Sequence, residues 1–118
     1  MELNFFESDA VPQPRDKVKI TQLSAQPYPD GWRVRIMLSV TPFQERPNLE
    51  VEVVTADNKP IAEMSIIETM HHVMEFTVHI RGTQNPAGDY LLRAELYYDD
   101  HANVQHRLEV PFTVAARA

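Results

Sequence analysis

The sequence predicts an all-β domain in which two antiparallel sheets pack face to face. Apolar and polar residues alternate along seven segments, as expected for strands, whose successive side chains point to opposite sides of a sheet. Clusters of Pro, Gly, Asn and Asp separate these segments about every dozen residues. Each strand therefore has one apolar face, and packing two sheets together buries all of these faces.

The clearest strand is the segment 32–40, in which Val34 and Ile36 share one face and Arg33 and Arg35 share the other. No segment keeps a helical period for more than about two turns, so no helix is expected. Six further segments alternate as the first one does: 17–25, 49–53, 61–67, 74–80, 90–98 and 107–114.

Three of these segments carry irregular features. In 17–25, Val18 points inward, and a β-bulge before Leu23 restores the alternation. The segment 61–67 alternates weakly, so its register stays open. Pro111 has no N–H to donate to a neighbouring strand, and it therefore predicts that the last strand lies at the edge of its sheet.

The connections between the segments contain residues that favour turns. Asn58 tolerates the left-handed conformation that a tight hairpin turn needs. The longer stretch 82–88 suits a crossing from one sheet to the other. Shorter runs of turn-forming residues are found at 27–31, 57–60 and 99–103.

One domain accounts for the chain. Its 118 residues, 43% of them apolar and 24% charged, are typical of a single globular domain, which we assign to residues 16–116. Residues 1–15 are interpreted as an N-terminal arm or linker, because apolar side chains are followed there by the Pro-rich run 11–14. The arm is expected to fold back on its own sandwich, and docking on a neighbouring molecule is the alternative.

The second half of the sequence carries a more specific pattern, namely Pro-Ala-Gly-Asp-Tyr-Leu-Leu-Arg-Ala at 86–94 and Phe-Thr-Val at 112–114. It resembles bacterial immunoglobulin-like and fibronectin type III-like domains, which carry Pro-x-Gly-x-Tyr-x-Leu-x-Ala on their sixth strand. The resemblance covers about the last 45 residues well. It implies a seven-stranded antiparallel Ig-like sandwich of Greek-key topology. It also implies a tyrosine corner, in which Gly88 supplies a turn and the Tyr90 hydroxyl bonds to the preceding crossing.

Two departures limit what this resemblance implies about function. Leu92 occupies the position at which an antibody-type domain has a cysteine. Trp32, the sole tryptophan, opens the second strand instead of the third. The resemblance therefore implies the fold without a ligand, since this fold hosts adhesion modules, enzyme accessory modules, chaperones and receptors.

Composition argues against several classes of function. The chain has no cysteine, so no disulfide, thiolate nucleophile or cysteine-bound metal is expected. The net charge of −6 argues against a nucleic-acid partner, and no run approaches the ~18 apolar residues of a membrane helix. The acidic start lacks the basic and apolar regions of a signal peptide. The sequence as written is expected in the cytoplasm, and a fragment of a longer exported protein would be extracellular.

No catalytic constellation or cofactor motif can be named, so we expect a non-enzymatic protein without catalytic residues, cofactor or metal. The acidic loops 57–58 and 99–103 are explained by turns without calcium. Tyr97 on an outward face and the loop residues Tyr28 and Phe43 belong to different regions, so they predict no sugar-binding platform. The five histidines show no ligand spacing: His71, His72, His79, His101 and His106.

Basic residues share the outward face of the sheet that the segments 17–25, 32–40 and 74–80 are expected to form. Together with Glu75 they give this face a net charge of +4, which leaves −10 for the rest of the chain. The face predicts an acidic protein partner, or a homodimer that pairs basic and acidic surfaces. A solvated face that prevents aggregation is the structural alternative. The basic residues are Lys17, Lys19, Arg33, Arg35 and Arg81.

The sequence thus predicts a non-catalytic binding module whose ligand is a protein. A carbohydrate-binding or accessory domain of an exported enzyme is the first alternative, for which Trp32 and Tyr97 would be the residues to mutate. A metal-binding domain that uses the scattered histidines is the second alternative.

Overall fold

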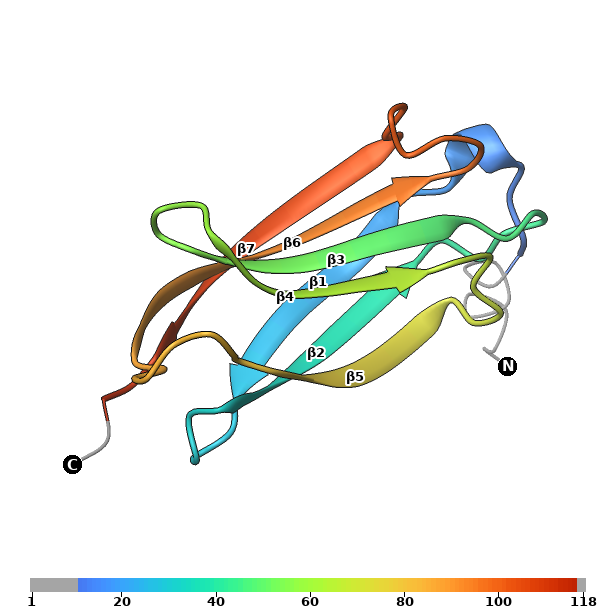
Figure 1. Cartoon of the computed structure of the whole chain (residues 1–118). Coiled ribbons are helices and arrows are strands. Elements are labelled where there is room, and N and C mark those ends of the chain that lie inside the picture. The colour runs from blue at the N-terminus through green and yellow to red at the C-terminus, as the bar shows by residue number, and fades with distance from the viewer. Residues whose placement is uncertain (1–10, 117–118) are drawn as a thin grey trace, which may run out of the picture.

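The computed structural model describes residues 11–116 as a sandwich of two sheets (Figure 1). The three-stranded sheet has the order β1-β2-β5 and the four-stranded sheet the order β4-β3-β6-β7, with every pair antiparallel. The predicted all-β, seven-stranded Ig-like fold is therefore confirmed. Its elements are the 3-10 helix η1 (Arg15–Lys17) and the strands β1 (Ile20–Pro27), β2 (Arg33–Val40), β3 (Asn48–Thr55), β4 (Pro60–Ile66), β5 (Val73–His79), β6 (Gly88–Tyr97) and β7 (His106–Val114).

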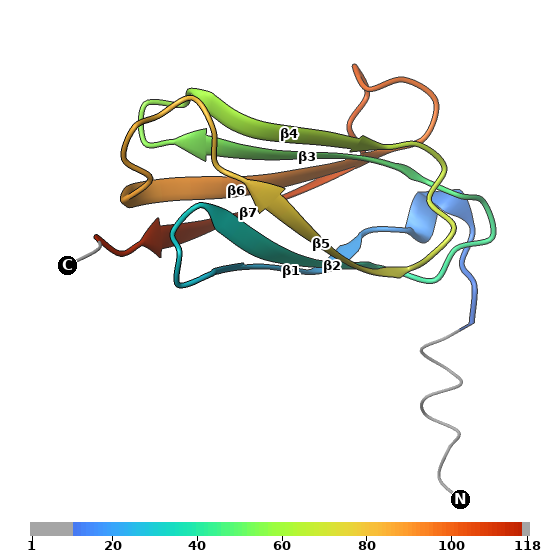
Figure 2. The ribbon, with the colours of Figure 1, turned by 60° about the horizontal axis from the view of Figure 1, so that its bottom comes forward.

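The core lies between the two layers, which Figure 2 shows edge-on. The central strand β2 places Val34, Ile36 and Leu38 fully inside, where they face the buried leucines of the other sheet. Alternation explains this arrangement, because the intervening residues of β2 are only half-buried or exposed. The leucines opposite are Leu49, Leu92 and Leu96.

The first strand begins later than the sequence suggests. Lys17 and Val18 donate backbone hydrogen bonds to Pro14 and Arg15, which closes a 3-10 turn at the point where the segment 17–25 was expected to start. Lys17 therefore precedes β1 instead of lying on it. The expected bulge is present, because the pairing of β1 with β2 shifts register between Ile20 and Gln22. The expected edge position of the last strand is also confirmed, since β7 ends its sheet.

The expected N-terminal arm is described only in part, because residues 1–10 lie outside the described residues. Gln13 forms a parallel bridge with Phe43, and its N–H donates to the Pro42 carbonyl at 2.9 Å. The Gln44 N–H donates to the Gln13 carbonyl at the same distance. The start of the described chain is thereby held against the β2–β3 connection.

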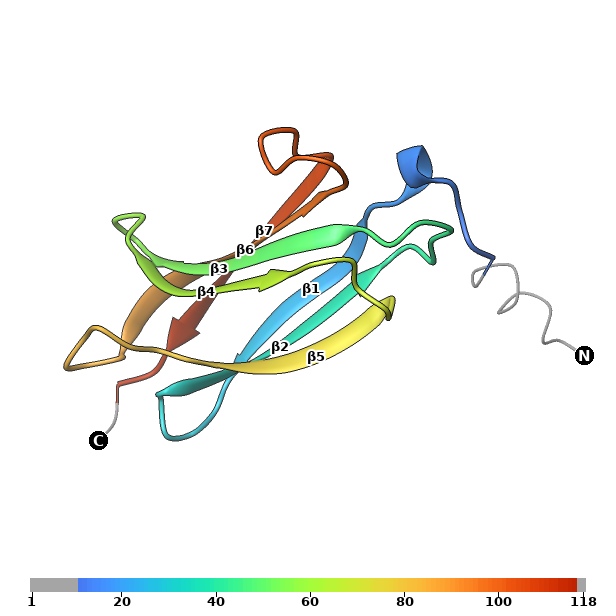
Figure 3. The ribbon, with the colours of Figure 1, turned by 45° about the vertical axis from the view of Figure 1, so that its right-hand side comes forward.

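The sandwich is closed on one side and open on the other. On the closed side, the Ile20 N–H of β1 donates to Nδ1 of His106 on β7 at 3.0 Å, and Gln105 Nε2 donates to the Val18 carbonyl at 2.7 Å. On the other side, β4 and β5 are the outer strands of different sheets and follow one another through the loop 67–72 (Figure 3). Among residues 11–116, each of these strands has one edge without a partner strand.

Closure by His106 predicts a dependence of stability on pH. Burial, and to a smaller extent Lys19, lowers the pKa of His106 below its ordinary value of 6.5. Nδ1 accepts from the Ile20 N–H, so protonation of Nδ1 would also remove this hydrogen bond. The unfolded chain binds the proton more readily, so this contribution is present above pH 6.5 and is lost as pH falls. We expect the free energy of unfolding to decrease below pH 6.5 with a slope of at most about 1.4 kcal/mol per pH unit for this proton.

Urea denaturation between pH 7.5 and pH 5 measures this effect. The variant His106→Asn keeps an acceptor near the Ile20 N–H but does not titrate, and it should remove this slope. His72→Asn changes an exposed histidine and is the control. A slope that survives in His106→Asn would assign the pH dependence to other groups.

Candidate functional site

The tyrosine corner lies where β6 begins. Gly88 adopts a φ of 142°, which favours glycine, and Tyr90 enters the core two residues later. The Tyr90 hydroxyl donates to the Pro86 carbonyl at 2.6 Å, and its ring stacks on Phe112 with centroids 5.4 Å apart. Burial raises the pKa of Tyr90. These contacts fix the 82–88 crossing to the core and leave no reactive group exposed, so their role is structural.

The residues expected to form a basic face belong to several elements, and two of them are paired with acids. Arg33 pairs with Asp30 at 2.8 Å and lies over the Tyr28 ring, while Arg35 pairs with Glu75 at 3.0 Å. These contacts neutralise much of the central charge. Of the remaining residues, Lys17 belongs to η1, Lys19 immediately precedes β1, and Arg81 lines a concavity beside β4.

The histidines do not converge. His71 and His72 belong to the β4–β5 loop and His79 ends β5, whereas His106 is engaged by β1. His101 bonds to Glu95 at 2.8 Å on the outer face of the four-stranded sheet. Among residues 11–116, no three His, Asp or Glu side chains are grouped so that they could hold a metal ion.

The aromatic residues are more covered than the sequence suggests. Tyr97 was expected to point outward, and its side chain is buried; His101 of the following loop lies against its ring in a tilted arrangement, with the centroids 4.9 Å apart. Trp32 and Phe43 are half-buried against the core. Tyr28 is covered by Arg33 at 4.3 Å. These four rings therefore do not line up as a flat exposed platform.

Charged side chains on the outer face of the four-stranded sheet form a paired network. Arg93 bonds to Glu52 at 3.0 Å and to Glu109 at 2.7 Å, so it links three neighbouring strands. Glu95 accepts from both His101 and Arg107. Burial raises the pKa of Glu95, but these two hydrogen bonds outweigh burial and hold the pKa below its usual value. Cross-strand pairing of this kind stabilises the sheet and leaves these groups engaged.

The open side of the sandwich contains an apolar groove, which we call the seam groove. It has a volume of about 680 Å³ and runs between β4 and β5 up to the connecting loop. Met64 and Ile66 line it from β4, and Met74 and Phe76 line it from β5. All four point toward the core side of their sheets, yet they remain only half-buried, because no strand of the described part of the chain lies between β4 and β5.

The loop at the end of the seam groove adds exposed apolar surface. Met70 is 69% exposed and Ile67 65% exposed, and both line the groove. The loop is held from below by Asn48, whose Oδ1 accepts from the Glu68 N–H at 2.8 Å. Thr69 N–H donates to the Pro47 carbonyl at 3.0 Å. Because its base is fixed, the loop presents these side chains instead of burying them.

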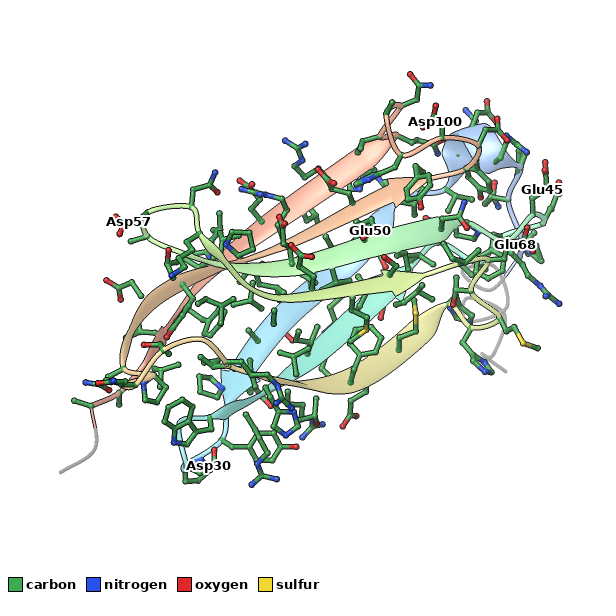
Figure 4. All side chains as sticks on the ribbon, viewed as in Figure 1. Asp30, Glu45, Glu50, Asp57, Glu68 and Asp100 are labelled. Carbon is green, nitrogen blue, oxygen red and sulfur yellow. The ribbon has the colours of Figure 1, made fainter. Side chains whose placement is uncertain are left out.

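A second concavity lies between β4 and β5 at the end of the seam groove that is far from the loop, and together the two form what we call the seam. It is lined by the beginning of β4 and the end of β5, including Ile61, Glu63, His79 and Arg81. Arg46 stands at the opposite end, on the wall of the seam groove. Figure 4 shows Glu68 and Glu45 at the end of the sandwich that carries the loop, and Asp30 at the other end. Because mainly apolar residues line the seam groove and mainly polar residues line the second concavity, the seam is apolar in one half and polar in the other.

Sequence reasoning did not identify the seam groove. Met64, Met74 and Phe76 alternate as core residues do, and nothing in their spacing shows that they lie on the uncovered side. The detectable signal was the run Ile66-Ile67, with Met70 and Val73 shortly after, where apolar residues break the alternation. Such a break indicates apolar side chains that a sheet cannot hide.

Several solved structures share this fold. A proposed β-galactosidase from Bacteroides fragilis matches with a TM-score of 0.60 and 12% identity over 83% of this chain and 18% of that chain. A β-glucuronidase from Bifidobacterium dentium matches with a TM-score of 0.55 and 12% identity, over 82% of this chain and 18% of that chain. A glycosyl hydrolase family 2 member from Bacteroides cellulosilyticus matches with a TM-score of 0.54 and 10% identity, over 82% of this chain and 15% of that chain.

These solved structures share the fold of this chain. The chain spans less than a fifth of the length of each of these glycosidase chains. No model of a known protein family and no curated sequence matches the chain. Within residues 11–116, no helix has the length and apolar character of a membrane span.

Proposed function

We propose that this chain is a non-catalytic interaction module that binds an extended apolar segment of a partner protein in the seam groove. The observation that carries this proposal is an exposed apolar groove bounded by β4 and β5, each of which has an outer edge that no other described strand pairs with. A continuous exposed apolar surface often marks an interaction site, whereas apolar residues that are exposed singly are common on any protein surface.

The chemistry of the groove suits a peptide strand. Free strand edges offer rows of N–H and C=O groups to an added strand, and the pockets beside them accept alternate side chains. Three methionines line the groove, and their flexible thioethers adapt to side chains of different shape. The charged network on the opposite sheet is already internally paired and offers no comparable surface.

Selection of random peptides displayed on phage tests the proposal, followed by fluorescence anisotropy with the selected peptides. Met70→Asp adds a charge to the groove at an exposed loop position, so it should weaken binding at least tenfold without unfolding the domain. Gln26→Asp adds the same charge to an exposed position of β1 and should leave the Kd unchanged. Equal binding to wild type and Met70→Asp, or no selected peptide, would overturn the proposal.

A second candidate function is an accessory domain of a glycoside hydrolase, which would place the chain outside the cell. The fold shared with portions of three glycosidase chains favours it. It is tested by screening the purified protein against immobilised glycans. Binding that is lost on replacing Trp32 or Tyr97 by alanine, in a variant that remains folded, would favour this candidate over the peptide-binding module.

A further inference from the structure

The free edge of β5 offers backbone groups at every second residue. The Val40 N–H donates to the His72 carbonyl and the Ile80 N–H donates to the Trp32 carbonyl, both at 2.8 Å, so even-numbered residues form the hydrogen-bonded pairs between β2 and β5. The N–H and C=O groups of the odd-numbered residues of β5 therefore point away from β2, where they meet no strand of the described part of the chain. These residues are Val73, Glu75, Thr77 and His79, and all four are exposed.

A strand added to this edge would enter the seam groove. Figure 3 shows β5 as the outermost strand of its sheet. Met74 and Phe76 face the groove from β5, whereas the alternate residues Glu75 and Thr77 face the outer side. The inward side chains of an added strand would continue the row of Met74 and Phe76 and would cover Met64 on the opposite wall.

The sequence of β5 is complementary to itself in one antiparallel register. Around a two-fold axis at Phe76, Val73 faces His79 of the second copy and Glu75 faces Thr77 of the second copy. All four residues with outward backbone groups then have hydrogen-bonding partners. Phe76 faces its own counterpart at a non-hydrogen-bonded position, where side chains come closest and aromatic pairs stabilise a sheet. No like charges face one another in this register.

The alternatives to this register fit less well. Moving the axis to Glu75 would place two carboxylates directly opposite one another, which is destabilising. Moving it to Thr77 would leave Val73 without a partner inside β5. Self-pairing of β4 is also disfavoured, because β4 begins with Pro60, which has no N–H, and carries Glu63 at its centre. Of the two strands that border the seam groove, β5 therefore has the edge better suited to a second copy.

We propose that the partner segment in the seam groove is β5 of a second copy of this chain. The two copies pair their β5 edges antiparallel and join two three-stranded sheets into one continuous sheet. This inference rests on the proposed function, because it names the extended apolar segment that occupies the same groove. Each copy contributes Phe76 to the groove of the other, so the site is completed only in the dimer.

Charge substitutions at Thr77 test the register, because this position faces Glu75 of the second copy twice in the dimer. Thr77→Glu should raise the dimer Kd about fivefold and Thr77→Lys should lower it about fivefold, as measured by sedimentation velocity of the full chain at low salt. Within one molecule Thr77 pairs with Arg35 of β2, so the two substitutions should affect the stability of the monomer in the opposite direction. Equal dimer Kd values for the two variants would overturn the proposed pairing.

Cysteine cross-linking tests the position of the axis, and the sequence contains no native cysteine that could interfere. In Phe76→Cys the two Cα atoms on the axis would lie about 4.5 Å apart, within the range of a disulfide. Met74→Cys is the matched control, because it is also half-buried on the groove side of β5. Its two copies would lie about 13 Å apart along the sheet. Under mild oxidation Phe76→Cys should give at least tenfold more covalent dimer, and equal yields would overturn the axis at Phe76.

The outcomes separate this inference from the proposed function. A wild-type chain that stays monomeric up to about 1 mM, yet binds selected peptides that Met70→Asp weakens, would overturn self-pairing and leave peptide binding intact. A dimer with the expected effects at Thr77, together with no peptide binding even in Thr77→Glu, would support the second copy and overturn an external partner.

Discussion

Replacing Ile36 with alanine is expected to lower the free energy of unfolding by about 3–4 kcal/mol, a large share of the stability of a domain this size. Ile36 has no solvent exposure and lies on β2, between β1 and β5. Its neighbours on these strands are fixed by pairing with Ala25 and Phe76, so the surrounding backbone cannot close the cavity.

Urea denaturation measures this loss, and Met37→Ala is the matched control. Met37 is the next residue of the same strand and points to the outer face, where it is half-buried. Its truncation should cost less than about 1 kcal/mol, because water already reaches the side chain. Equal losses at the two positions would show that β2 does not separate a core face from an outer face.

Replacing Asn48 with alanine is the second change expected to have a large effect, with a loss of about 2–4 kcal/mol. The Asn48 side chain is buried, and it donates to the Tyr98 carbonyl at 2.6 Å while accepting from the Glu68 N–H at 2.8 Å. Alanine leaves both backbone groups without a partner. The loss should also loosen the loop that carries Met70, so peptide affinity should fall together with stability.

Hydrogen exchange of the Glu68 amide measures the local part of this effect. We expect faster exchange in Asn48→Ala, and slower exchange again in Asn48→Asp, which keeps an acceptor at this position. Asn103→Ala alters an exposed loop residue and should change neither the exchange rate nor the stability. Unchanged protection of Glu68 in Asn48→Ala would mean that the loop is held by Thr69 alone.

The position of individual side chains was predictable where alternation is regular. Val34 and Ile36 were expected to share the apolar face of their strand, and neither side chain has any exposure. The start of the first strand was not predictable, because a 3-10 turn at Pro14 depends on backbone bonds that leave no periodic signal. The burial of Tyr97 was missed for a related reason, because His101, which packs against its ring, lies in the loop that follows the strand.

The charges show the same limit. Arg33 and Arg35 were correctly predicted to share an outward face, yet their charge is balanced by Asp30 and Glu75. Asp30 precedes the strand and its side chain accepts from the Trp32 N–H as well, so its position follows from a turn. Counting the charges on each face of a predicted strand leaves out residues such as Asp30, which lies in a turn and reaches that face from outside the strand.

The sequence by itself determined that this chain forms two sheets with a common core, because a period of two residues assigns each side chain to a face. Only the tertiary structure decided which pair of edges closes and which stays open. Contacts such as that of His106 with Ile20 hold β1 to β7, whereas β4 and β5 remain apart. Met64 and Met74 have the spacing of core residues, but β4 and β5 belong to different sheets, which no local pattern encodes, and these residues therefore line an open groove.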